Sequence, residues 1–83
     1  MRHTFTPHAE QMFIERGIER DWVLETVRNP ERVEADPSKT GRSRAFRRVP
    51  ENDNRWLRVV FDGSEYEIVV VTVFFDRGAG RWA

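Results

Sequence analysis

The sequence predicts an α+β domain in which an N-terminal pair of helices packs on one face of an antiparallel sheet of three or four strands. Three observations support this fold class. Apolar residues recur with helical spacing before Pro30, they recur at every second position after it, and "DGSE" at residues 62–65 indicates a tight hairpin between the last two strands. We expect residues 1–83 to form one domain, because the chain has the length of a single small domain. A chain this short buries only about 60% of its unfolded surface, so we expect low stability.

Start and stop signals delimit the two helices. The Thr6 hydroxyl can cap free amides and Pro7 suits the first helical position, so the first helix starts there and ends at Gly17. The second should run over about residues 19–29, because Pro30 forbids its continuation. The predicted apolar stripes are Ala9, Met12 and Phe13 in the first helix and Val23, Leu24 and Val27 in the second. The pair forms an αα-hairpin.

The strands follow Pro30 in order. "ERVEA" predicts a short peripheral strand, and "DPSKTG" after it is a loop of turn residues. Three longer strands are expected over residues 43–49, 55–62 and 66–75. The last of these is apolar on both faces, which favours a central position in the sheet. Residues 77–83 are expected to form a frayed tail.

The hairpin predicts which side chains share a face. If Gly63 is the first of two loop residues, Asp62 lies opposite Glu65. The helix-covered face would then hold Leu57, Val59, Phe61, Tyr66, Ile68, Val70 and Phe74, and the other face Trp56, Arg58, Val60, Val69, Val71 and Val73.

The arginine-rich stretch "GRSRAFRR" at residues 41–48 belongs to the preceding strand. Pairing Val49 with Arg55 would place Arg44, Phe46 and Arg48 beside Trp56 and Arg58 on the second face, whereas a shift of one residue would bring Arg47 there instead. Alternating arginines and aromatic rings are typical of surfaces that bind single-stranded nucleic acids. Cross-strand arginine–aromatic packing is also ordinary sheet stabilisation.

Several segments carry a family resemblance. "HAEQMFIERGI", "VLETVRNPERV", "LRVVF" and "IVVVTVFF" resemble the family called domain of unknown function 4258, over nearly the whole chain. More distantly, the order of elements, with "GI" between the helices and "NP" after the second, is similar to BrnT-type toxins and the RelE-like ribonuclease fold. Members of the family that the chain resembles commonly show a histidine that opens the first helix, an arginine–glycine pair that closes it, and arginines on the middle strands. Here these are His8, Arg16 with Gly17, Arg44 or Arg47, and Arg58.

Cleavage of RNA without a metal requires a base, an acid and cations that stabilise charge on the phosphate. Arginine suits the cationic role because its planar fork binds phosphate through two hydrogen bonds. On an ideal helix Glu15 lies about 20° around the axis from His8, so the two could act together. The candidate catalytic residues are His8, Glu15 and Arg58, and the candidate RNA- or phosphate-binding residues are Arg16, Arg44, Phe46, Arg47, Arg48 and Trp56.

Two functional interpretations from different classes remain open. The first is a toxin-like module that binds RNA, or cleaves it without a metal, through the arginine–aromatic face. The second is a non-catalytic module that binds an acidic partner protein, such as a cognate antitoxin. The formal net charge of zero favours the second interpretation, and the clustered arginines favour the first.

Composition also excludes several classes of protein. Cysteine is absent and there are two histidines, so we expect no disulfide framework, no metal site and no cofactor. No apolar segment reaches the roughly 20 residues of a membrane span, and the N-terminus lacks a signal-peptide pattern. We therefore expect a cytoplasmic protein with no membrane partner. Its small core is compatible with a homodimer.

Overall fold

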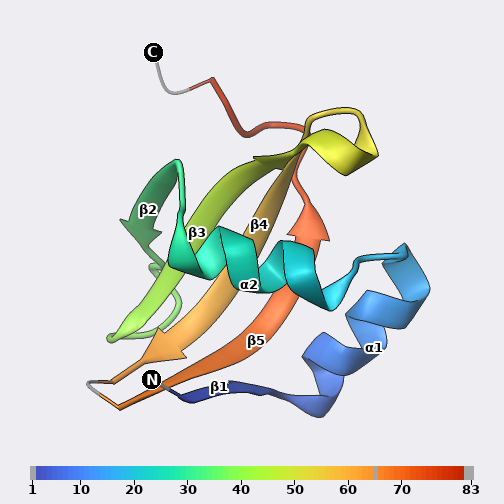
Figure 1. The fold of residues 1–83 in the computed structure, drawn as a ribbon. Helices are drawn as coiled ribbons and strands as arrows, with labels where there is room; N and C mark the ends of the chain where they lie inside the picture. Colours follow the sequence, from blue (N-terminus) through green and yellow to red (C-terminus); the bar gives the residue numbers. More distant parts are fainter. Residues whose placement is uncertain (1, 65, 82–83) are drawn as a thin grey trace.

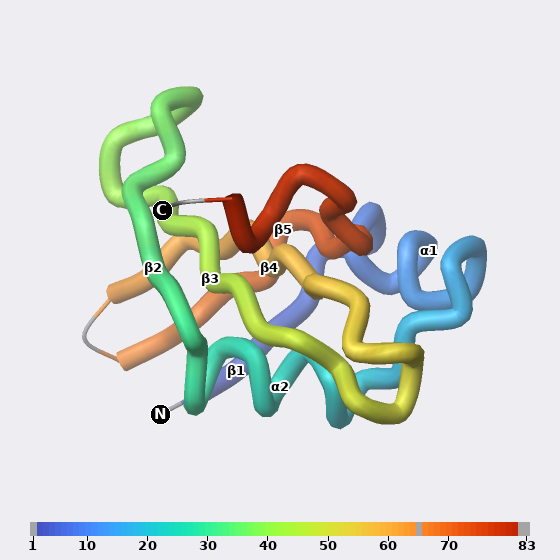
Figure 2. The backbone as a smooth tube through the Cα atoms, turned by 90° about the horizontal axis from the view of Figure 1, so that it is seen from above, coloured from blue at the N-terminus to red at the C-terminus, as the bar shows by residue number. Residues whose placement is uncertain are grey.

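The computed structural model describes residues 2–64 and 66–81 and confirms the α+β fold class (Figure 1). The elements are β1 (Arg2–Phe5), α1 (Pro7–Arg16), α2 (Arg20–Arg28), β2 (Arg32–Ala35), β3 (Arg42–Val49), a short 3-10 helix (Pro50–Asn52), β4 (Arg55–Gly63) and β5 (Glu67–Phe75). The strands form one sheet in the order β1-β5-β4-β3-β2. α2 crosses one face of this sheet and α1 lies beside β5 (Figures 1 and 2).

The helix ends follow from their capping residues. Thr6 Oγ1 accepts a hydrogen bond of 3.1 Å from the Ala9 amide, and Gly17 ends α1 in the left-handed conformation, with φ of 61°. The Thr6 hydroxyl also donates to the Val71 carbonyl at 3.0 Å, which ties the start of α1 to β5. α2 has no side-chain cap, because Glu19 at its N-cap makes no such hydrogen bond.

β1 is a strand that the sequence analysis did not predict. It pairs with β5 in parallel, from Arg2 opposite Glu67 to Phe5 opposite Val70, so the sheet is mixed and not purely antiparallel. "RHTF" is too short and too polar for the periodicity to reveal, and its partner lies far away in the sequence. With β1 on one side and β4 on the other, β5 has the predicted central position.

The predicted register of the last hairpin is wrong. Gly63 lies opposite Ile68 and Val60 opposite Thr72, with a register shift between Val60 and Phe61. The shift leaves Val71 as an extra residue in β5, whose carbonyl accepts the Thr6 hydrogen bond. Because a strand that is apolar on both faces contains no pattern to define its register, the sequence could not reveal this bulge. The predicted partner of Asp62, Glu65, lies outside the described residues.

The bulge exchanges which β5 side chains face the helices. Val73, predicted on the far face, is fully buried in the core, whereas Phe74 lies beside Arg58 on the far face. Phe75 takes the position facing the core that Phe74 was expected to have. Tyr66, predicted on the helix-covered face, is 77% exposed. Leu57, Val59, Phe61, Ile68 and Val70 lie on the predicted face.

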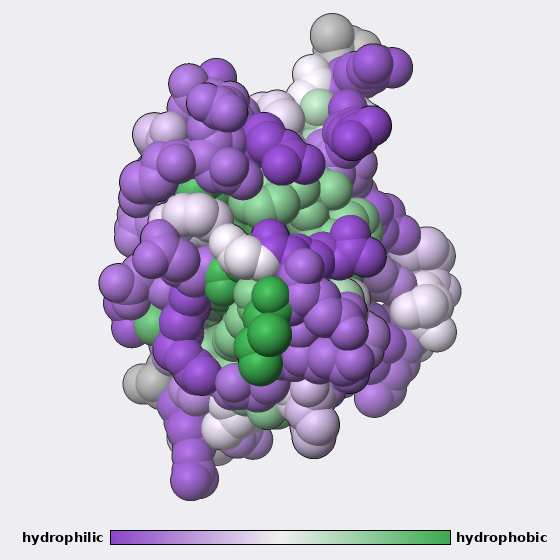
Figure 3. Space-filling model, turned by 90° about the vertical axis from the view of Figure 1, so that its right-hand side faces the viewer, coloured by the Kyte–Doolittle hydropathy of each residue, from purple (hydrophilic) through white to green (hydrophobic). Residues whose placement is uncertain are grey.

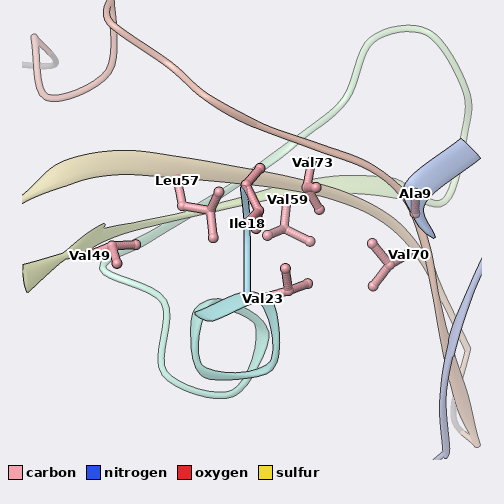
Figure 4. Close-up of a cluster of buried hydrophobic side chains, with 8 residues drawn as sticks. All are labelled: Ala9, Ile18, Val23, Val49, Leu57, Val59, Val70 and Val73. Carbon is pink, nitrogen blue, oxygen red and sulfur yellow. The ribbon is translucent and has the colours of Figure 1, made fainter. Parts of the chain in front are cut away.

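The core lies between α1, α2 and one face of the sheet. Its buried members are Ala9, Ile18, Val23, Val49, Leu57, Val59, Val70 and Val73 (Figure 4). Val23 projects from α2 toward the strands, so burial of the helix stripe holds the helix on the sheet (Figure 4). In the described segments, no helix has both the length and the apolar character needed to cross a membrane.

Candidate functional site

The register of the arginine-rich strand is the one that the sequence analysis predicted. Val49 lies opposite Arg55, Arg48 opposite Trp56, and Phe46 opposite Arg58. The alternation of side chains therefore puts Arg44, Phe46, Arg48, Trp56 and Arg58 on the face away from α2.

Carboxylates of the same chain neutralise the arginines of this face. Arg48 forms an ion pair of 2.7 Å with Glu31. Arg44 lies 3.1 Å from Asp36 and 3.2 Å from Glu34. Hydrogen bonds from Arg48 lower the pKa of Glu31, and those from Ser38, followed by Arg44, lower the pKa of Asp36 to about 2. These guanidinium groups are thus already engaged.

The aromatic residues of the same face are not an open stacking platform. Phe46 is only 2% exposed. The Arg48 guanidinium lies 5.3 Å from the ring centroid of Trp56, and a Cβ added to Gly80 would come within 2.7 Å of Trp56 Nε1. The segment that contains Gly80 passes over the sheet on the side opposite α2 (Figure 2). Bases would have to displace these contacts before they could stack.

Arg58 is held within the fold. Its guanidinium lies 5.0 Å from the ring centroid of Phe74 and 5.8 Å from that of Phe46, and Nη1 donates to Asp76 at 3.2 Å. Its Nε is buried without a hydrogen-bond partner among the described residues. Asp76 also donates its amide to the Trp56 carbonyl at 2.8 Å. Arg58 therefore fastens the end of β5 to the sheet.

Arg47 points to the other face, where it contacts the end of α2. Its Nη1 donates to the Asn29 carbonyl at 2.7 Å, and its Nη2 lies 3.9 Å from Glu25. A cation at this position satisfies a carbonyl at the helix C-terminus and interacts favourably with the helix dipole.

The predicted pair of His8 and Glu15 is not brought together. His8 lies in the first turn of α1, with Nε2 3.2 Å from Thr72 Oγ1. Glu15 lies near the other end and accepts a hydrogen bond of 2.8 Å from Gln11. Seven residues separate the two along the helix, which corresponds to about 10 Å of rise. The two side chains lie on the same side of the helix, but His8 contacts Thr72 and Glu15 contacts Gln11.

A different group of residues forms an open cleft of about 600 Å³ at the end of α1. Its lining consists of Glu15, Arg16, Arg55, Phe75 and Arg77. Arg16 belongs to the last turn of α1, Arg55 begins β4, and Arg77 follows β5. On the side of the molecule that carries α1, apolar atoms are exposed in a hollow between hydrophilic groups (Figure 3).

Local structure explains why these residues meet. The chain returns from β3 to β4 through Asp53 and Asn54, both with φ of 56°, a conformation that Asn and Asp tolerate better than other non-glycine residues. This turn places Arg55 next to the end of β5. Because of the bulge, Phe75 faces the core side, where its ring lies edge-on to Trp22 at 6.3 Å between centroids.

The arginines of the cleft form no ion pairs with described residues, and they outnumber its one carboxylate, Glu15. Of the thirteen arginines, Arg2, Arg16, Arg28, Arg55, Arg77 and Arg81 form no ion pair with another described residue. Three of these six line this one cleft. Arg55 Cζ lies 4.6 Å from the centroid of the Phe75 ring, so one guanidinium rests on the aromatic floor. Converging arginines without ion pairs to described residues, beside a half-buried ring, can hold an anion.

Two of the five lining residues, Glu15 and Arg16, are among the site residues predicted from the sequence, and Arg55, Phe75 and Arg77 are not. Their positions gave no local signal, because residues 16, 55 and 77 meet only through the order of the strands. The described residues contain no group of three or more His, Cys, Asp or Glu side chains that could hold a metal ion.

Comparison with known proteins shows the family of the chain. No curated protein and no solved structure matches it. Residues 5–75 match the family described as Domain of unknown function (DUF4258), a stretch that contains Arg16, Arg55 and Phe75 and ends before Arg77. Since this match covers most of the 83 residues, the chain belongs to the DUF4258 family.

Proposed function

We propose that the protein is a small RNA-binding domain that holds the phosphates of a single strand in the cleft at the end of α1. One observation carries this proposal: three arginines that form no ion pair with another described residue, Arg16, Arg55 and Arg77, line one cleft beside the half-buried Phe75 ring. Arginine forks bind phosphate oxygens, and the plane of a guanidinium such as that of Arg55 can stack on a base. This site replaces the arginine–aromatic sheet face, whose cations are already paired.

Binding without cleavage is the function that this geometry supports best. Cleavage would need a group that accepts a proton and another that donates one. The cleft lining contains one carboxylate, Glu15, and neither of the described histidines, His3 and His8. The toxin-like ribonuclease interpretation therefore lacks a second proton-transfer group at this site.

A salt titration tests the proposal. The dissociation constant of a fluorescent single-stranded RNA should rise steeply with salt, with a logarithmic slope of about 0.7 for each phosphate that is neutralised. Arg55→Ala and Arg77→Ala should each weaken binding and reduce the slope by about that amount. Arg28→Ala is the matched control, because Arg28 also forms no ion pair with a described residue but lies at the end of α2, outside the cleft. Equal losses in all three variants, or no affinity at low salt, would contradict the proposal.

One observation favours an acidic partner protein as the second candidate. Ile14, in the same turn of α1 as the cleft residues Glu15 and Arg16, is 85% exposed. An apolar side chain beside a cationic cleft suits a peptide that carries both acidic and apolar residues. In that case an acidic peptide containing leucines binds more tightly than polyglutamate of equal charge, and Ile14→Ser removes the difference.

A further inference from the structure

A second hollow adjoins the cleft, and the two share a wall. It has a volume of about 270 Å³, just below the roughly 300–1,000 Å³ of typical ligand pockets, so it suits a ligand fragment of modest size. Arg55, Phe75 and Arg77 line both spaces. The second hollow adds Asp53 and Asn54 from the turn before β4. A group bound there would lie next to an anion in the cleft.

The polar groups of the second hollow differ in whether they already form hydrogen bonds within the protein. The Asp76 carboxylate accepts hydrogen bonds from Arg58 and from the Gly78 amide. The Asp53 side chain makes no hydrogen bond or ion pair with any other described residue, and neither does the Asn54 side chain. The turn that carries them is held by a 3.0 Å hydrogen bond from the Asn54 amide to the Val49 carbonyl. A free carboxylate and a free amide therefore sit side by side on an anchored turn.

This arrangement fits one nucleobase better than the others. The pairing edge of guanine presents two adjacent N–H donors, N1–H and the N2 amino group, next to the O6 acceptor. A carboxylate can accept from both donors at once, and an Asn amide can donate to O6. Adenine and cytosine present a donor beside a ring acceptor, and uracil presents one donor between two acceptors, so each would place an acceptor against the carboxylate.

We propose that the second hollow binds the base that adjoins the phosphate in the cleft and selects guanine through Asp53 and Asn54. This inference rests on the proposed RNA binding and adds to it a base preference. The Arg55 guanidinium, which lies 4.6 Å from the centroid of the Phe75 ring, supplies a stacking plane between the two spaces. Asp53 also disfavours additional phosphates by its negative charge, which limits the hollow to the base.

The test compares short RNAs that differ at one base. UUGUU should bind at least about fivefold more tightly than UUAUU or UUUUU, the lower end of the discrimination that a bidentate side-chain–base pair provides. UUIUU, in which inosine lacks the N2 amino group, should fall between them. Asp53→Asn should abolish the preference for guanine, because its amide can no longer accept from both donors. The variant keeps the turn, since Asn tolerates the left-handed conformation as Asp does.

Asp21→Asn serves as the control, because it removes one negative charge from a residue that lines neither the cleft nor the second hollow. It should leave the ratio of UUGUU to UUUUU affinities unchanged. Equal binding of UUGUU, UUAUU and UUUUU by the native protein would overturn the base preference while the RNA-binding proposal stands. A guanine preference that survives Asp53→Asn would overturn the role of Asp53. Failure of all RNAs to bind at low salt would overturn both proposals.

Discussion

Arg44 and Arg55 show how the neighbours of a residue decide its function. Arg44 lies 3.2 Å from Glu34 and 3.1 Å from Asp36, whereas Arg55 has an aromatic ring and no carboxylate partner among the described residues. The same side chain thus serves as an internal link in one place and as a free cation in the other. Its rigid fork suits both uses, because it pairs with a carboxylate of the protein as well as with a phosphate of a ligand.

The ion-paired carboxylates predict how stability depends on pH. The pKa of Asp36 is lowered to about 2 by Ser38 and then Arg44, and Arg42 lowers the pKa of Asp62. A carboxylate with a lowered pKa in the folded state contributes stability that is complete above its unfolded pKa of about 4. We expect the urea midpoint to fall between about pH 4 and pH 2. Asp36→Asn should make this fall smaller, and a midpoint independent of pH in this range would contradict the interpretation.

Arg58 should matter for stability and not for RNA affinity. Its side chain is 21% exposed and packs on two rings, so Arg58→Ala should lower the free energy of unfolding by about 1–3 kcal/mol. His8→Ala, in an exposed turn, should stay within about 0.5 kcal/mol of the native protein. Chemical unfolding and RNA titration of the two variants check this. A large loss of RNA affinity in a folded Arg58→Ala variant would indicate that RNA binds to the sheet face and not in the cleft.

At the scale of elements, the bulge in β5 links the fold to the cleft. Val71 is the extra residue, and its carbonyl accepts the hydroxyl of the residue that caps α1. Without the bulge, alternation would turn Phe75 away from the core side and remove the floor of the cleft. The start of α1 and the end of β5 are therefore positioned together.

Thr6 is the residue that makes this link. Thr6→Ala removes the cap of α1 and leaves the Val71 carbonyl without its hydroxyl donor, so the free energy of unfolding should fall by about 1–2 kcal/mol. Thr6→Ser keeps the hydroxyl and is the matched control. Urea unfolding measures the difference. Equal stability of the alanine and serine variants would show that the hydroxyl is not what joins the two elements.

At the scale of the whole molecule, a formal net charge of zero conceals an uneven surface. Carboxylates neutralise the cations on the sheet face away from α2, and unpaired cations gather at the end of α1. Net charge alone is therefore a poor guide to binding here, because a ligand responds to the local field of the cleft.

The small core implies that single buried residues carry much of the stability. Leu57 is fully buried between β3 and β5, and Leu57→Ala should cost about 2–5 kcal/mol, a large part of the roughly 5–15 kcal/mol of a typical domain. Ile14→Ala is the control, because Ile14 is 85% exposed and should change stability by less than about 0.5 kcal/mol. Thermal and urea unfolding of both variants test the contrast, which would fail if the two losses were similar.

Signals within the sequence predict the α+β class, both helices and the central position of β5. They favour the observed pairing of Val49 with Arg55 but leave a shift of one residue open. These features depend on local signals such as Thr6, Gly17 and Pro30, and on hydrophobic periodicity, which a single sequence displays directly. The same signals place the arginine-rich strand face correctly, but they do not say whether its cations are free.

The parallel strand β1, the bulge at Val71 and the cleft depend on tertiary contacts that no local signal predicts. Each brings together residues that are far apart in the chain: Arg2 pairs with Glu67, Thr6 bonds to Val71, and Arg16, Arg55 and Arg77 line one cleft. Whether an arginine is ion-paired also depends on tertiary contacts. Arg48 and Arg55 are the same residue type, and Arg48 is paired because the fold brings Glu31 next to it. Hydrophobic periodicity predicts which face of a helix or strand a residue occupies. A binding site depends instead on which elements lie next to each other in space, and this is set by the topology of the chain.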